Sequence, residues 1–246
     1  MAEMERNYLG RTATTDVAID VGLREYMLRV YNYMASGLAL TGIVAYAIAN
    51  SSLITLFFQR MPTGGYAPTL LGWVAMIAPL GFVFFLSFRI ESMRFSTAQA
   101  VFWAYAAVMG ASLTTIFLQF TGASVARVFF ITAGTFGAMS LYGYTTKSDL
   151  SRFGSFLFMG LIGIVIASLV NMFVASSALQ FAISVIGVLV FVGLTAYDTQ
   201  RIKDLYMQSD DSEVMGKKAL MGALSLYLDF INLFVLLMQL VGQRRD

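Results

Sequence analysis

Long apolar segments alternate with short polar connections along most of the chain. Seven of these segments approach the roughly 20 residues that a helix needs to cross a bilayer. They predict an all-α integral membrane protein with seven transmembrane helices, at about 27–49, 68–88, 97–119, 122–144, 154–175, 178–198 and 219–241. Residues 26–246 are therefore expected to form a single membrane domain.

The first 25 residues differ from the rest, because they mix both charge signs and lack an apolar core. This composition predicts a polar tail and not a signal peptide. Over the whole chain, 58% of residues are hydrophobic and 12% are charged, about half the charged share of soluble domains. The 21 glycines are expected to let helices pack closely, especially the pairs Gly37/Gly42, Gly134/Gly137 and Gly160/Gly163.

The basic residues are distributed unevenly between the two ends of the predicted bundle. Of the 16 lysines and arginines, only Arg60, Arg127, Arg244 and Arg245 fall on the side opposite the N-terminus, which leaves twelve on the N-terminal side. Since cytoplasmic loops are enriched in positive charge, this asymmetry predicts a cytoplasmic N-terminus and, after seven spans, a C-terminus outside.

A single carboxylate interrupts the last apolar segment. Asp229 lies inside Leu224–Leu240, and an ionised carboxylate in hydrocarbon costs several kcal/mol unless it has a partner. On a helix it shares a face with Ser225, Asn232 and Gln239, which form a polar seam on an otherwise apolar rod. Such a rod belongs inside the bundle; the alternative role of the seam is hydrogen bonding between helices.

Asp198, at the end of the sixth predicted span, is the expected partner of Asp229. Two carboxylates in a medium of low dielectric constant share a proton, and the pair becomes sensitive to pH. Arg89 and Arg94, near the end of the second span, are candidate counter-cations. The alternatives are pairing of Asp198 with Arg201 at the membrane edge, and arginines that only extend into the interface.

Several function classes are excluded or disfavoured. The chain has no cysteine and no histidine, which excludes thiol catalysis and histidine-ligated metal sites. No hydrolase, metalloprotease or nucleotide-binding motif is present, so the protein is not expected to be an enzyme or to need a cofactor. The net charge of +2 does not indicate a nucleic-acid partner. The acidic segment 201–218 lacks the calcium-loop pattern and is expected to be a solvated loop.

Several segments resemble the Bax inhibitor family of membrane proteins, also called the transmembrane Bax inhibitor motif family. The strongest are Tyr197–Gln200 (YDTQ) and Leu224–Phe234 (LSLYLDFINLF). Supporting segments are Met34–Leu38 with Thr41, Tyr142-Gly143 and Thr146–Leu150. The resemblance covers all seven predicted spans, and the short loops are similar to those of bacterial members.

The resemblance implies six helices around a central C-terminal helix, and a calcium leak that responds to pH. It also implies that Asp198 and Asp229 form the proton-sharing pair and that an arginine of the second span contacts it, with Arg89 and Arg94 both near that place. Some relatives carry a glutamate in the second span. Here Leu71–Met76 (LGWVAM) contains no acid, so a role that needs this glutamate is not expected.

Three functions remain open. The first is a cation leak channel of a bacterial inner membrane, conducting calcium and gated by protonation of the aspartate pair. The second is a proton-coupled carrier that uses the same carboxylates as a relay. The third is an interaction protein that regulates a protease or another membrane complex through a membrane protein partner.

Overall fold

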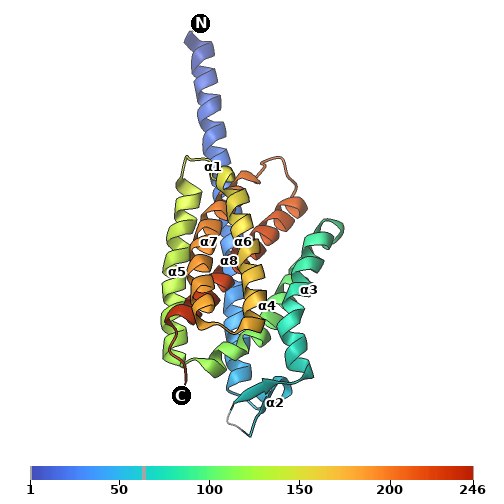
Figure 1. Cartoon of the computed structure of the whole chain (residues 1–246). Coiled ribbons are helices and arrows are strands. Elements are labelled where there is room, and N and C mark those ends of the chain that lie inside the picture. Colours follow the sequence, from blue (N-terminus) through green and yellow to red (C-terminus); the bar gives the residue numbers. More distant parts are fainter. Residues whose placement is uncertain (1, 63–64, 246) are drawn as a thin grey trace.

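Seven long helices dominate the structure, a computed structural model that describes residues 2–62 and 65–245, with side chains from Val21 onward (Figure 1). They are α1 (Ala2–Ala49), α3 (Leu70–Arg89), α4 (Phe95–Gln119), α5 (Gly122–Thr145), α6 (Ser151–Val174), α7 (Ser177–Asp204) and α8 (Ser212–Val241). Each contains a stretch long and apolar enough to cross a membrane. The predicted all-α membrane fold is therefore confirmed.

Short elements fill two of the connections. Between α1 and α3 lie α2 (Ile54–Phe57) and an antiparallel hairpin of β1 (Phe58–Arg60) and β2 (Tyr66–Pro68). A 3₁₀ turn, η1 (Ile90–Ser92), joins α3 to α4. The hydrophobicity pattern did not predict the hairpin, because three-residue strands are too short to show a period. The chain ends lie at opposite ends of the bundle, as an odd number of spans requires (Figure 1).

Two predicted polar segments turn out to be largely helical. Helix α1 has helical backbone from Ala2, so the predicted tail runs into the first span without a break in secondary structure. The loop predicted at 201–218 is wrong, since α7 continues to Asp204 and only 205–211 lie outside helices. Asp211 caps α8 by accepting a 2.7 Å hydrogen bond from the Val214 amide, and Lys217 pairs with Glu213 one turn later at 3.2 Å.

Helix α8 is the most buried of the spans. In its most apolar window 67% of the residues are buried, against 11–39% in the other six spans. It packs against α1, α4, α5 and α7, whereas α3 packs mainly against α4, and α6 against α7. The arrangement of six helices directly around a central one is therefore not confirmed, although α8 does lie inside the bundle as its polar seam predicts.

Only two of the six glycines that were predicted to make close helix contacts do so. Gly37 faces Phe102 and Tyr227, and Gly160 faces Val190. Four others have open space where a side chain would be: Gly42, Gly134, Gly137 and Gly163. A small residue in a membrane helix therefore did not identify a contact by itself, since it can equally face lipid or a cavity.

Helix α5 approaches α7 closely at Gly143, where a Cβ atom would collide with the backbone of Ala196. We expect Gly143→Leu to lower the free energy of unfolding by about 1–3 kcal/mol or to prevent folding, because backbone cannot move aside as a side chain can. Gly134→Leu, in the same helix but facing open space, is the matched control and should unfold at the parent temperature. Thermal unfolding in detergent measures both; equal stabilities would contradict the contact.

Candidate functional site

Asp198 of α7 and Asp229 of α8 lie together, and their carboxyl groups are within hydrogen-bonding reach of each other. Asp229 is only 5% exposed. If both groups are ionised, Asp229 Oδ2 is buried without a hydrogen-bond donor among the described residues. One proton held between the two carboxyls would supply that bond and remove one of two like charges.

The Ser225 hydroxyl, one turn before Asp229, donates a 2.7 Å hydrogen bond to Asp198 Oδ2. Ser225 therefore bridges the two helices. Asn232 behaves differently, because its amide donates a 2.8 Å bond to the Leu228 carbonyl of its own helix.

The residues beside Asp198 hold α7 in place. The ring of Tyr197 lies against Gly154 of α6, where a Cβ atom would collide with it. Two residues after Tyr197, the Thr199 hydroxyl lies 2.9 Å from the Ser140 hydroxyl of α5. Asp198 itself contacts α8. Three consecutive residues thus fix α7 against three different helices, and this places the Asp198 carboxyl.

Gln200 completes this frame by holding the connection between α5 and α6. Its Oε1 accepts a 2.7 Å hydrogen bond from the Leu150 amide, and its Nε2 donates a 2.9 Å bond to the Ser148 carbonyl. Gln200 and Leu150 are both buried, so the Leu150 amide depends on Gln200 for a partner.

Two cavities meet at Asp198. A cavity of about 1020 Å³ lies between α6, α7 and α8 and is lined by all four residues of the polar seam, Ser225, Asp229, Asn232 and Gln239. A smaller one of about 430 Å³ lies toward the start of α8 and includes Glu91, Lys217 and Lys218. Asp198, Arg201 and Ser225 line both cavities. These three residues form the wall between the two cavities.

A cluster of amides lines the other end of the large cavity. Gln180 Nε2 of α7 donates to Gln239 Oε1 of α8 at 2.5 Å, and Ser184 donates to the same oxygen at 3.1 Å. Asn171 of α6 donates to Gln180 Oε1 at 3.1 Å. Sequence reasoning found Gln239 but missed its partners. The available signal was amide side chains within apolar segments.

Comparison with known proteins identifies the family of this chain. A family model described as an inhibitor of apoptosis-promoting Bax1 matches residues 23–246. The chain belongs to the Bax inhibitor-1 family. It is 49% identical over 228 residues to the inner membrane protein YbhL of Escherichia coli, covering 91% of this chain and 94% of YbhL.

Two further relatives come from distant bacteria. An uncharacterized protein of Rickettsia prowazekii is 49% identical over 235 residues, which cover 96% of each chain. A membrane protein of Streptococcus pyogenes is 36% identical over 229 residues, which cover 91% of this chain and 95% of the relative. The similarity to these Bax inhibitor-1 relatives spans the whole membrane domain.

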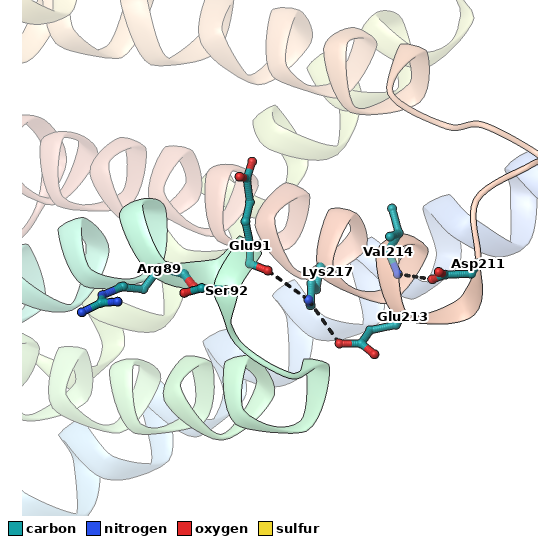
Figure 2. A network of polar contacts seen from close by, with 7 residues as sticks. All are labelled: Arg89, Glu91, Ser92, Asp211, Glu213, Val214 and Lys217. Atoms are coloured by element: carbon teal, nitrogen blue, oxygen red, sulfur yellow. Dashed lines mark hydrogen bonds and ion pairs between the residues drawn. The ribbon is translucent and has the colours of Figure 1, made fainter.

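The candidate counter-cations Arg89 and Arg94 are not brought to the aspartates. Within the described residues, neither arginine forms an ion pair or lines the two cavities. Figure 2 shows Arg89 extending away from Lys217, which instead contacts the Glu91 carbonyl at 3.4 Å. The cation beside the pair is Arg201, whose charge acts on Asp198 although the two form no direct ion pair in the described structure.

No cluster of three or more carboxylates that could bind a metal ion occurs among the described residues. The charged groups that line the large cavity are one carboxyl pair and one arginine, and a second polar site lies at the amide cluster. This Bax inhibitor-1 chain thus carries ionisable groups at one end of a membrane cavity and neutral amides at the other.

Gln200→Leu tests the frame around Asp198. We expect it to lower the free energy of unfolding by about 1–3 kcal/mol, because two backbone groups lose their buried partner. Amide hydrogen exchange at Leu150 should accelerate. Gln208→Leu, at an exposed position beyond α7, is the control and should change neither property. Unchanged exchange at Leu150 in Gln200→Leu would contradict the assignment.

Proposed function

We propose that the protein is a cation leak channel, conducting calcium, whose opening is controlled by protonation of the Asp198–Asp229 pair. The observation that supports this most directly is the position of Asp198, in the wall between two cavities and beside a buried second carboxyl. A change of charge at that wall is suited to open or close a path between the cavities.

Calcium suits the groups that line the path. Hard divalent cations prefer carboxylate, amide and hydroxyl oxygens. The large cavity offers these along its length, from Asp198 and Asp229 past Asn232 to Gln180 and Gln239. Neutral amides bind a cation weakly enough to release it, as conduction requires.

The gating step follows from the charge of the pair. With one shared proton the pair carries a single negative charge, which attracts the Arg201 guanidinium and holds the wall closed. A second proton removes this charge and releases the arginine. The leak should therefore increase as pH falls.

The proposed setting is a bacterial inner membrane, as in YbhL, the relative named an inner membrane protein. The twelve-to-four distribution of basic residues supports a cytoplasmic N-terminus and an outer C-terminus. The smaller cavity, with Lys217 and Lys218, then faces the cytoplasm. In this arrangement the pair senses cytoplasmic pH.

Asp229→Asn should abolish the pH dependence of the leak near neutrality. The variant keeps the side-chain shape but leaves Asp198 without a second carboxyl to share a proton with. The measurement is calcium efflux from vesicles that contain purified protein, over a series of pH values. Asp204→Asn, which removes an exposed carboxylate six residues beyond Asp198, is the matched control. If Asp229→Asn responds to pH like the parent, the proton-sharing pair is not the sensor.

Arg201→Gln should raise the leak several-fold at neutral pH, because the wall loses the cation that the pair attracts. Arg89→Gln and Arg94→Gln serve as controls and should retain the parent flux, since neither arginine lines the two cavities. A raised leak in Arg89→Gln or Arg94→Gln, with no change in Arg201→Gln, would assign the counter-cation to the end of the second span instead.

A proton-coupled carrier is the second candidate, and the size of the large cavity favours it. A volume of about 1020 Å³ is at the upper end of small-molecule sites. The same vesicles distinguish the two functions. A carrier gives saturable uptake of an organic solute together with proton flux, whereas a leak channel gives calcium flux without either.

A further inference from the structure

A third cavity, of about 570 Å³, lies on the face of α8 opposite the polar seam. Phe230, Ile231 and Phe234 of α8 line it, and α1, α4 and α5 complete its walls. Most of the lining is apolar, and the cavity is separate from the aspartate pair. The proposed function makes no use of it.

Small residues create this space. Gly42 of α1 and Gly122 at the start of α5 both line the cavity, and neither has a heavy atom near the position of a Cβ. Helices α1 and α5 pack mainly against other helices and not against each other. Because the walls lie within the apolar spans, the medium around this gap is lipid hydrocarbon and not water.

The segment 242–245, which follows α8 and which we call the strap, lies across the end of α4 and the start of α5. The Gln243 amide donates to the Ser124 hydroxyl at 2.8 Å, and the Gln243 carbonyl accepts from the Thr121 amide at 3.0 Å. Two residues on, the Arg245 amide donates to the Gln119 carbonyl at 2.9 Å. The backbone of this segment is thus held in a defined position.

The strap places an arginine over an apolar cavity. Arg245 lines the cavity, and its Nη1 donates to the Phe117 carbonyl at 3.1 Å, which leaves other guanidinium donors available. This end of the bundle also carries Arg60, Arg127 and Arg244. The described acidic residues lie at the other end or at the Asp198–Asp229 pair, so no described carboxylate neutralises this end.

We propose that this cavity binds an anionic phospholipid of the surrounding membrane, with one acyl chain inside it and the phosphate on Arg245. The apolar lining matches the chain, since an inserted chain makes van der Waals contacts that an unfilled cavity lacks. The guanidinium matches the phosphate, which it binds through two parallel hydrogen bonds. The excess of positive charge in the sequence of this end, four arginines against the single acidic residue Asp246, favours an anionic headgroup over a zwitterionic one.

Native mass spectrometry of the purified full chain, titrated with phosphatidylglycerol or phosphatidylcholine, tests this site. The parent should retain one phosphatidylglycerol more tightly than phosphatidylcholine. Gly42→Phe, which fills the cavity without a backbone clash, should lose that lipid. Arg245→Gln removes the charge and can keep at most one of the two hydrogen bonds to the phosphate, so it should weaken phosphatidylglycerol binding roughly tenfold and should remove the preference.

Gly134→Phe is the matched control, because Gly134 also faces open space but does not line this cavity. It should bind like the parent.

Retention of the lipid by Gly42→Phe would overturn the site. Equal binding of both lipids, with no effect of Arg245→Gln, would overturn the headgroup assignment. Thermal unfolding of Gly42→Phe checks its fold, and Arg245→Gln, at an exposed position, tests the proposal independently of packing.

Discussion

Burial of the Asp229 carboxyl within the most buried helix is the constraint on which the arrangement of the other helices depends. A membrane interior cannot solvate an isolated carboxylate, and several kcal/mol are lost unless a proton or a partner is supplied. Helix α8 must therefore be placed where a polar group of another helix reaches it. The contact with α7 at Asp198 and Ser225 meets this requirement, and the apolar sides of α8 are left to pack against α1, α4 and α5.

The contacts of helix α7 with its neighbours determine the position of that partner, Asp198. Between Tyr197 and Gln200, successive side chains contact α6, α8, α5 and the connection at 148–150. No single one of these contacts needs to be strong, because together they leave the Asp198 carboxyl one place to lie. The run of four polar and aromatic residues Tyr197–Gln200 is thus explained by contacts with four different neighbours, only one of which belongs to the ionisable pair.

The number and type of spans were predictable from hydrophobicity, and Asp229 was recognisable because charge in an apolar segment has a large energetic cost. Details that depend on contacts with neighbouring residues were not predictable in this way. The segment 201–218 is rich in charge, yet its charges cap and pair along the start of α8, so composition predicted a loop where helices continue. Arg89 and Arg94 follow the second span as expected but line neither cavity beside the aspartates. Gly42 looked like a packing residue and instead lines a cavity.

Helix α8 separates two cavities of opposite character. Its polar seam faces the 1020 Å³ cavity beside α6 and α7, and its apolar face lines the 570 Å³ cavity beside α1 and α5. Because the other contacts of α8 are close-packed, a displacement of this helix toward one cavity enlarges the other. An acyl chain in the apolar cavity would oppose displacement in that direction. If the phospholipid and the proton bind as proposed, they act on the same helix from opposite sides, and their binding equilibria are linked reciprocally.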